Sequence, residues 1–328
     1  MKYEITVVTA IYNSENYIEK CVRSLFEQSF KNIEFIFIDD GSTDQSVLIL
    51  ENLISEYSYR KNNITIINLT SNNGPAYVKQ LGINNAKGKY IICIDSDDYV
   101  EKEMLAEMHA KAVSNHAEIV TCYVMLEYKD RSLCNKEFTS DNFEDRMREI
   151  ILNEHTNGYL CNKLVLKDLY LRSNCFPPKS MRYLEDLYIV TRLYFNAKLI
   201  IPIHKAYYHY VKYNVNSITN SDFHKLYKSH KLYWKLQEEF YKKNNLETTY
   251  ASEISSNKTL SYLNLIFRIQ NISKYINFGK EINQLNLQPN TKLKIGQIII
   301  LYSLNKKLYI LSFLILKIIQ YKNKHLKI

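Results

Sequence analysis

The first hundred residues alternate short β-branched runs with amphipathic helical segments, and this alternation restricts the possible folds more than any other feature of the chain. Runs rich in Ile, Val and Thr suit strands that are buried on both faces. The predicted strands are 5–9, 35–38, 64–68 and 90–94, and the predicted helices are 16–30, 46–57 and 75–86. Strands that alternate with helices at this spacing predict parallel β-α-β units.

Four polar clusters follow the four predicted strands, each at the point where a strand ends. They are Tyr12-Asn13, Asp39-Asp40, Asn72-Asn73-Gly74 and Asp95-Ser96-Asp97-Asp98. In open α/β sheets, ligands bind beyond the carboxyl ends of the strands. The sequence therefore predicts that these four clusters line one binding site.

The cluster Asp95–Asp98 places three carboxylates directly after a buried strand. Crowded carboxylates repel one another unless a cation neutralises them. Mg²⁺ and Mn²⁺ take one or two carboxylates and complete their coordination with phosphate oxygens and water. A helix N-cap before 101–112 is the structural alternative, but a cap needs a single Asp. The cluster is predicted to hold a metal and a diphosphate.

The turn Asp39–Asp44 has a structural and a functional interpretation. An Asx turn with Gly41 at the bend and Asp44 as a helix cap explains its composition. In the functional interpretation, a carboxylate at the strand end accepts a hydrogen bond from a base or a ribose. Tyr12 could stack on a nucleobase or pack beside the sheet.

These segments together resemble family 2 inverting glycosyltransferases of the GT-A fold. The matching pieces are Thr9-Ala-Ile-Tyr-Asn13 with Glu15, Ile38-Asp-Asp-Gly-Ser-Thr-Asp44, Asn72-x-Gly74, Gly82 to Gly88, and Ile94-Asp-Ser-Asp-Asp98, over residues 3 to about 110. The resemblance implies an α/β fold, with a GT-A (Rossmann-like), mostly parallel sheet flanked by helices and a C-terminal helical extension. It also implies a UDP-sugar donor and Mn²⁺ or Mg²⁺ as the cofactor.

The resemblance further implies roles for individual residues. The residue matching Asp40 binds the nucleobase, those matching Asp95 and Asp97 contact the ribose and the metal, and that matching Asp98 ligates the metal. The donor-binding residues implied are Ala10 through its backbone, Tyr12, Glu15, Asp40, Asn72, Gly74, Lys79, Asp95, Ser96 and Asp97. Many relatives have Arg-Asn where this chain has Lys79-Gln80, and a lysine offers a point charge without the planar fork of arginine.

A second match lies at Asn162-Lys163-Leu164 and Tyr183-Leu-Glu-Asp-Leu-Tyr188. It resembles the Glu-Asp motif of the same family, which implies that Asp186 is the catalytic base. An inverting transfer needs one carboxylate to deprotonate the acceptor hydroxyl, although charge at a helix N-terminus also explains an acidic pair. His209 could approach the metal, with Asp97 and Asp98 as the main ligands, or could be an ordinary packed histidine.

The expected organisation has three parts. They are a nucleotide-sugar-binding half over 1–110, an acceptor-binding half over 111–220, and a helical region over 221–328. The six cysteines are scattered without a C-x-x-C pair, and no signal peptide precedes the first strand, so a cytoplasmic protein is expected.

The helical region ends in a basic and apolar tail. No Asp or Glu follows Glu281, while eight lysines do. Such a tail suits a helix lying on an anionic membrane surface, which would make the protein peripheral on the inner face of a membrane. Core helices packed on the catalytic domain, or a homo-oligomer formed through the C-terminal helices, are alternatives. Long aliphatic side chains dilute the charge, so nucleic-acid binding is not expected.

The expected function is transfer of a sugar from a UDP-sugar to an acceptor hydroxyl, on a glycan or lipid-linked glycan for surface polysaccharide synthesis. Transfer to a polyprenyl phosphate and non-catalytic nucleotide-sugar binding are the alternatives. A nucleotidyltransferase would require a glycine-rich phosphate loop after the first strand, and Tyr12-Asn13-Ser14-Glu15 is not such a loop.

Overall fold

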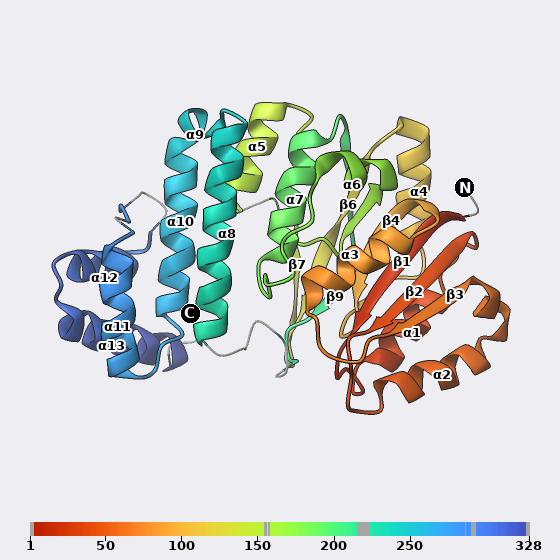
Figure 1. The fold of residues 1–328 in the computed structure, drawn as a ribbon, viewed down its shortest axis with the longest axis horizontal. Coiled ribbons are helices and arrows are strands. Elements are labelled where there is room, and N and C mark those ends of the chain that lie inside the picture. The colour runs from red at the N-terminus through yellow and green to blue at the C-terminus, as the bar shows by residue number, and fades with distance from the viewer. Residues whose placement is uncertain are drawn as a thin grey trace. The chain divides into compact units, whose positions relative to one another are not determined.

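The computed structural model describes residues 3–153, 156, 158–214, 223–285, 287–289 and 293–325. The chain divides into two compact units, 1–220 and 221–328. The first unit is built on a β-sheet with helices on both faces, and the second is made of helices (Figure 1). The α/β, GT-A-like class expected from the sequence, with a C-terminal helical region, is confirmed.

Nine strands within the described residues form one mixed sheet. Its order is β3-β2-β1-β4-β8-β6-β9-β5, and β7 pairs with β6 beside this path. The strands are β1 Tyr3–Ile11, β2 Ile33–Asp39, β3 Ile64–Asn68, β4 Gly88–Asp95, β5 Tyr99–Val100, β6 Ile119–Glu127, β7 Ser132–Asn135, β8 Lys163–Leu166 and β9 Ile200–Val211. The strands β3, β2, β1 and β4 are mutually parallel, as the sequence predicts.

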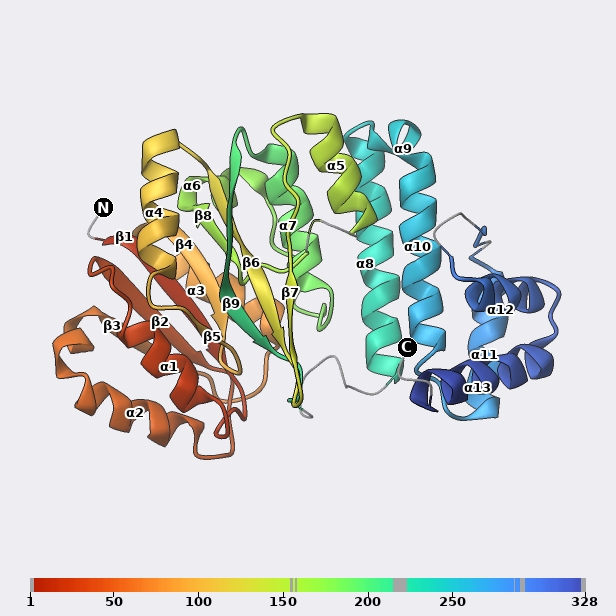
Figure 2. The same ribbon diagram turned by 180° about the vertical axis from the view of Figure 1, so that it is seen from behind.

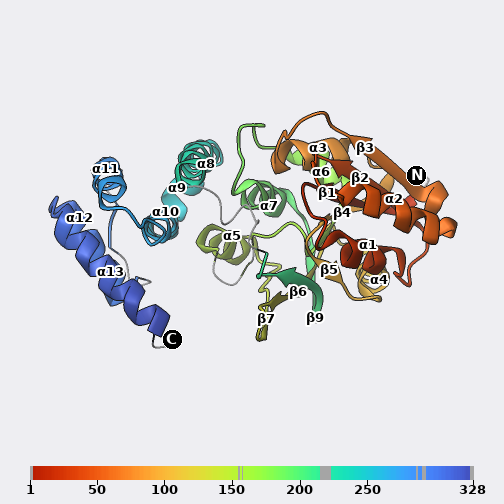
Figure 3. The same ribbon diagram turned by 90° about the horizontal axis from the view of Figure 1, so that it is seen from below.

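Helices cover both faces of this sheet. Helices α1, α2 and α4 lie on one face, and α3 and α6 lie on the other (Figure 3). The helices of the first unit are α1 Ile18–Phe26, α2 Ser46–Glu56, α3 Pro75–Asn85, α4 Met104–Asn115, α5 Phe143–Leu152, α6 Lys167–Ser173 and α7 Glu185–Asn196, with a 3₁₀ turn at Ser58–Asn63. Because both faces are covered, every residue of β2 is buried, whereas β3 at the sheet edge is half-exposed.

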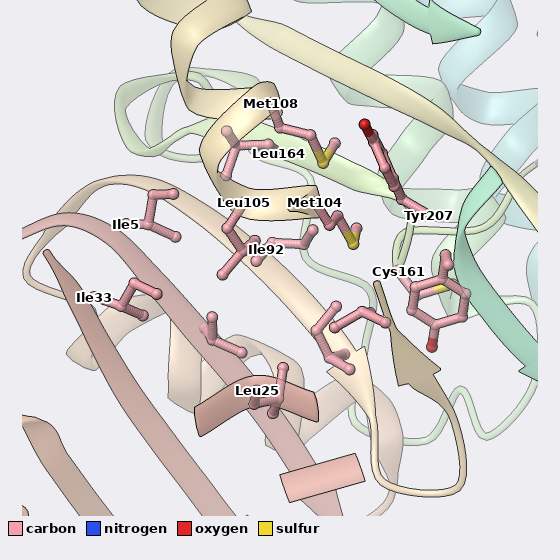
Figure 4. Close-up of a cluster of buried hydrophobic side chains, with 14 of the residues drawn as sticks. Ile5, Leu25, Ile33, Ile92, Met104, Leu105, Met108, Cys161, Leu164 and Tyr207 are labelled. Atoms are coloured by element: carbon pink, nitrogen blue, oxygen red, sulfur yellow. The ribbon is translucent and has the colours of Figure 1, made fainter. Parts of the chain in front are cut away.

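The main hydrophobic core lies between the sheet and the helices α1, α2 and α4. Figure 4 shows Met104, Leu105 and Met108 of α4 packed toward Ile92 of β4 and Leu164 of β8. This core joins the parallel strands to the antiparallel β8. It therefore holds the ends of β1, β2 and β4 at one edge of the sheet.

The second unit contains antiparallel helical segments that are visible in Figure 2. They are α8 Phe223–Lys243, α9 Leu246–Thr249, α10 Ala251–Ile266, α11 Ile272–Asn283, α12 Ile295–Asn305 and α13 Tyr309–His325. Buried aromatic side chains fill its interior, among them Trp234, Tyr262 and Tyr275. Among the described residues, no helix is both long and apolar enough to cross a membrane.

A glycine on α3 allows this helix to lie directly on the sheet. A Cβ atom at Gly82 would lie 2.2 Å from Val8 Cγ1 and 3.0 Å from Ile38 Cδ1. These contacts are far below van der Waals distance, and the neighbouring side chains belong to the central strands β1 and β2. The close approach of α3 therefore requires glycine at this position.

We predict that Gly82→Ala lowers the free energy of unfolding by about 1–3 kcal/mol, because overpacking displaces the helix from the sheet. Denaturant titration measures this change. Asn84→Ala, at an exposed position of the same helix, is the matched control and should leave stability unchanged or slightly raised. Equal stability of Gly82→Ala and wild type would contradict the packing described.

Candidate active site

The turn Asp95–Asp98 connects β4 to β5 at the carboxyl edge of the sheet. The Asp98 backbone N–H donates to the Asp95 carbonyl at 3.1 Å, which closes the turn. The buried Asp98 carboxylate accepts from Tyr208 Oη at 2.5 Å and from the Val211 N–H at 2.8 Å. Burial, with Asp97 and Asp95 nearby, raises the pKa of Asp98 well above its usual range. Asp98 thus joins the turn to β9.

Asp97 has a different environment from Asp98. Its Oδ2 accepts a hydrogen bond from Asn214 Nδ2 at 2.8 Å. Lys212 lies in the same turn after β9; burial lowers its pKa, while the nearby Asp98 and Asp97 act in the opposite direction. The carboxylates of the turn after β4 and the lysine of the turn after β9 therefore lie near each other, a combination suited to a metal-bound diphosphate.

The ammonium of Lys79 lies within ion-pair distance of three carboxylates of the site. Its Nζ lies 2.5 Å from Asp186 Oδ1 and 3.1 Å from Glu185 Oε1. Asp95 Oδ1 is 3.8 Å away from the same Nζ atom. Burial disfavours the charged ammonium, but the surrounding carboxylates outweigh burial and raise the pKa of Lys79. One ammonium thus brings together α3, the end of β4 and the start of α7.

The carboxylates around Lys79 differ in how strongly burial affects them and in how exposed they are. Burial raises the pKa of Asp95 to about 7, although Lys79 opposes this shift. Burial also raises the pKa of Glu185, again against the effect of Lys79. Asp186 is the more exposed member of the Glu-Asp pair, with 21% of its side chain accessible against 12% for Glu185. Of the two acidic residues at the start of α7, Asp186 is therefore the one more open to solvent.

The start of α7 positions Asp186. Leu184, directly before the helix, has a left-handed backbone conformation with φ of 68°. The second carboxylate oxygen of Asp186 accepts the N–H of Leu160 at 3.3 Å. The Leu160 amide and the Lys79 ammonium thus each hold one oxygen of the Asp186 carboxylate.

Asp40 connects the end of β2 with the loop before α3. Its two oxygens accept the N–H groups of Asn73 at 2.6 Å and Gly74 at 2.8 Å. The neighbouring Asp39 accepts the N–H of Ser42 at 3.1 Å, as in an Asx turn. Asp40 thus shapes the loop beside which the resemblance places a nucleobase.

The end of β1 provides an open surface. Ala10 lies in register with Ile38 of β2 and Asp95 of β4, so its backbone is at the centre of the sheet edge. Tyr12 follows it with 49% of its surface exposed. Glu15 Oε2 accepts the N–H of Gln45 at 3.0 Å, and this bond connects the loop after β1 to the beginning of α2.

Asn72 and Gly74 both contact the side chain of Arg182. Arg182 Nη1 donates to Asn72 Oδ1 at 2.5 Å, and its Nη2 donates to the Asn72 carbonyl at 3.3 Å. A Cβ atom at Gly74 would lie 2.5 Å from Arg182 Nη1, and Gly74 has φ of 92°. The arginine therefore connects the α3 loop to the segment before α7.

His209 lies away from this cluster. Its Nδ1 is 2.7 Å from Glu127 Oε1, its Nε2 is 2.8 Å from Glu101 Oε1, and its ring stacks on Tyr99 at 4.3 Å. Because side chains alternate along β9, His209 and the Asp98-bound Tyr208 point to opposite faces. The expectation that His209 approaches the metal receives no support from this position.

Several residues of the site were not found by sequence reasoning. Arg182, Tyr208 and Asn214 contact predicted site residues but belong to no motif used above. The period-two alternation of Tyr207-Tyr-His-Tyr210 is a signal that could have placed Tyr208 opposite to His209. No local signal distinguishes Arg182 from other surface arginines.

Among the described residues, no three Asp, Glu, His or Cys side chains form a ready protein-only metal site. This is compatible with a metal that takes most of its ligands from a diphosphate and water. Burial is the main cause that raises the pKa of Asp95 and Asp98, and the neighbouring carboxylates raise it further. Asp97 fits a metal better than Asp98, because protein donors already contact both oxygens of Asp98.

Comparison with known proteins identifies the family. The model of glycosyl transferase family 2 matches residues 6–171, which include the Asp95–Asp98 turn and the strand β4 that leads into it. The chain belongs to glycosyl transferase family 2. It is therefore a glycosyltransferase, as the motifs predict.

Relatives with similar sequences include bacterial proteins. EpsH of Bacillus subtilis, provisionally named as a glycosyltransferase, is 27% identical over 77% of this chain and 73% of its own length. The poly(ribitol-phosphate) β-N-acetylglucosaminyltransferase TarS of Staphylococcus aureus is 30% identical over 65% of this chain. That match spans only 36% of the length of TarS.

Solved structures confirm the fold. The chain is similar to S. aureus TarS 1–349 in complex with UDP-GlcNAc, with a TM-score of 0.67, 20% identity and coverage of 93% of this chain and 88% of that one. A mannosyltransferase from Pyrobaculum calidifontis, in complex with GDP-Man and Mn²⁺, is similar with a TM-score of 0.51 and 11% identity, over 95% and 86% of the two chains.

We predict that Lys79→Met destabilises the protein by several kcal/mol, because three carboxylates lose their shared cation. Without Lys79, the pKa values of Asp95 and Glu185 rise further above their unfolded-state values. In the wild type Asp95 already keeps its proton up to a folded pKa of about 7, so the deficit of the variant relative to wild type should grow as pH rises through about 7. Thermal melts of both proteins across pH measure this difference.

The exposed Lys87, whose Nζ lies 3.6 Å from Glu34, provides the matched control. Lys87→Met should change stability by less than about 1 kcal/mol at any pH. A Lys79→Met deficit that is independent of pH would contradict the electrostatic role of Lys79.

Proposed function

We propose that the chain transfers a sugar from a UDP-sugar to an acceptor hydroxyl, with inversion at the anomeric carbon. One observation carries the proposal. The carboxylate at the start of α7 and the carboxylate at the end of β4 lie beside the same Lys79 ammonium, at 2.5 and 3.8 Å. A base and a diphosphate-binding turn are therefore neighbours, as a single-displacement transfer requires.

The donor lies, in this proposal, along the carboxyl ends of β1, β2 and β4. Asp40 and the exposed Tyr12 flank the nucleobase, and the Ala10 backbone and Asp95 face the ribose and the first phosphate. The fold is shared with TarS, whose 1–349 fragment has been solved with UDP-GlcNAc, and this supports UDP as the nucleotide. Lys212 and Lys79 provide positive charge near the diphosphate.

The reaction requires one proton transfer. Asp186 accepts the proton of the acceptor hydroxyl while that oxygen forms a bond to the anomeric carbon. The bond between the anomeric carbon and the phosphate oxygen breaks, and UDP leaves with its electron pair. Lys79 Nζ lies 2.5 Å from Asp186 Oδ1 in this structure, and the incoming acceptor hydroxyl takes its place beside the carboxylate.

A divalent cation fits the turn beside Asp97. We propose that Asp97, together with Asp95, holds Mn²⁺ or Mg²⁺, and that Asp98 positions the turn through Tyr208 and Val211. The ion would neutralise the charge that develops on the diphosphate leaving group. This assignment differs from the sequence-based expectation, which placed Asp98 among the metal ligands and nominated His209 as well.

The acceptor is proposed to be a glycan or a lipid-linked glycan of a surface polysaccharide. TarS, named for transfer to poly(ribitol-phosphate), offers a precedent among the relatives. Transfer to a polyprenyl phosphate remains the second candidate, and it needs no strong base because a phosphate acceptor is already ionised. Dependence on Asp186 therefore separates the two.

We expect Asp186→Asn to lower kcat for transfer to a hydroxyl acceptor by about 10²–10⁴-fold, because the general base is lost. Asn remains isosteric and can still accept from Lys79, so the fold and UDP affinity should persist. Asp168→Asn, at a carboxylate with 71% of its side chain exposed, is the matched control and should retain full activity. Full activity of Asp186→Asn would exclude this residue as the base.

We expect Asp97→Asn to weaken UDP binding in the presence of Mn²⁺ by at least about tenfold, because a charged metal ligand is lost. Isothermal titration with UDP, with and without Mn²⁺, measures the effect. Binding by the variant in the absence of metal should resemble that of wild type. If UDP binding by the wild-type protein does not depend on metal, the metal assignment is wrong.

A further inference from the structure

Helices α12 and α13 carry a concentration of exposed apolar side chains. Of the twenty large apolar residues that are exposed among the described residues, ten lie on or between these two helices. We define the α12–α13 surface by these ten residues: Ile295, Ile298, Ile299, Tyr302, Leu308, Ile310, Leu311, Leu314, Ile318 and Tyr321. A concentration of exposed apolar side chains on two neighbouring helices points to an interaction surface.

The apolar residues of α13 form a stripe. At about 100° per residue, Ile310, Leu314, Ile318 and Tyr321 fall within roughly 80° of the helix circumference. The other face of the helix is occupied within the second unit. There Ser312, Phe313 and Leu316 are buried, and Ser312 Oγ lies 2.5 Å from Tyr275 Oη of α11. The helix is therefore anchored by one face and leaves the apolar stripe open.

Helix α12 repeats this arrangement. Ile295 is 78% exposed and Tyr302 is 63% exposed. They are seven residues, or two helical turns, apart and so lie on the same face of the helix. Ile300, Leu301 and Leu304 point to the interior and are buried. The exposed residues are thus not a defect of packing, because each helix has a complete buried face as well.

The charged side chains of α12, α13 and the turn between them are of one sign. At about 100° per residue, Lys317 and Lys322 fall on either side of the α13 stripe. The exposed Lys306 and Lys307 lie in the turn between the two helices. The sequence contains no Asp or Glu after Glu281. An apolar stripe bordered by lysines is the pattern of a helix that lies in the interface of an anionic bilayer.

We propose that the α12–α13 surface binds the surface of a membrane that contains anionic lipids. Self-association is disfavoured by charge, since a two-fold interface would bring the lysines of two copies together with no carboxylate from these helices to pair with them. This proposal is independent of the proposed sugar transfer, because it uses only the second unit.

Vesicle flotation of the full chain tests the proposal. Phosphatidylcholine vesicles in which about a third of the lipid is phosphatidylglycerol should bind the protein, and pure phosphatidylcholine vesicles should bind it far less. Each of Lys306→Gln, Lys307→Gln, Lys317→Gln and Lys322→Gln should weaken binding by about fivefold. The triple variant Ile310→Ser, Leu314→Ser, Ile318→Ser should weaken it by more than about a hundredfold.

Leu171→Ser is the matched control, since this leucine of α6 is 60% exposed but lies in the first unit. It should bind vesicles as wild type does, and circular dichroism should show equal folding of all variants. Failure of the wild-type protein to bind anionic vesicles would overturn the proposal, and so would equal binding to neutral vesicles. A wild-type dimer that the triple variant converts to a monomer, without vesicle binding, would assign the surface to self-association instead.

Discussion

A single buried ammonium, that of Lys79, holds Asp95, Glu185 and Asp186 at the carboxyl edge of the sheet. The three carboxylates come from the end of β4 and the start of α7, and without a cation they would repel one another in a poorly solvated place. The position of α7 relative to the parallel strands therefore depends on this charge. The same ammonium holds the candidate base close to the turn that is proposed to hold the diphosphate.

The parallel sheet makes this arrangement possible. Gly82 lets α3 lie directly on β1 and β2, which brings Lys79, one turn earlier on the helix, to the sheet edge. Asp40 connects β2 to the loop before α3, and Asp98 connects the turn after β4 to β9. Asp40 and Asp98 thus shape the loops around the site.

The first hundred residues could be interpreted well from the sequence because strand and helix periodicities alternate there and polar clusters follow each strand. The GT-A fold and the family followed from these local signals. The role of Asp98 could not be predicted, because its partners Tyr208 and Val211 are more than a hundred residues away in the chain. The contact of Arg182 with Asn72 could not be predicted for the same reason, because these residues are 110 positions apart in the chain. His209 was nominated by residue type, although strand alternation turns it to the other face.

The central claim is that Asp95–Asp98 and Asp186 form one site for a nucleotide-sugar and its acceptor. A crystal structure of the chain with UDP and Mn²⁺ tests this claim most directly. The account predicts the uracil beside Asp40 and Tyr12, the metal between Asp97 and the diphosphate, and Asp186 on the side where the sugar would lie. A nucleotide bound elsewhere on the chain, or a diphosphate whose metal does not touch the Asp95–Asp98 turn, would contradict it.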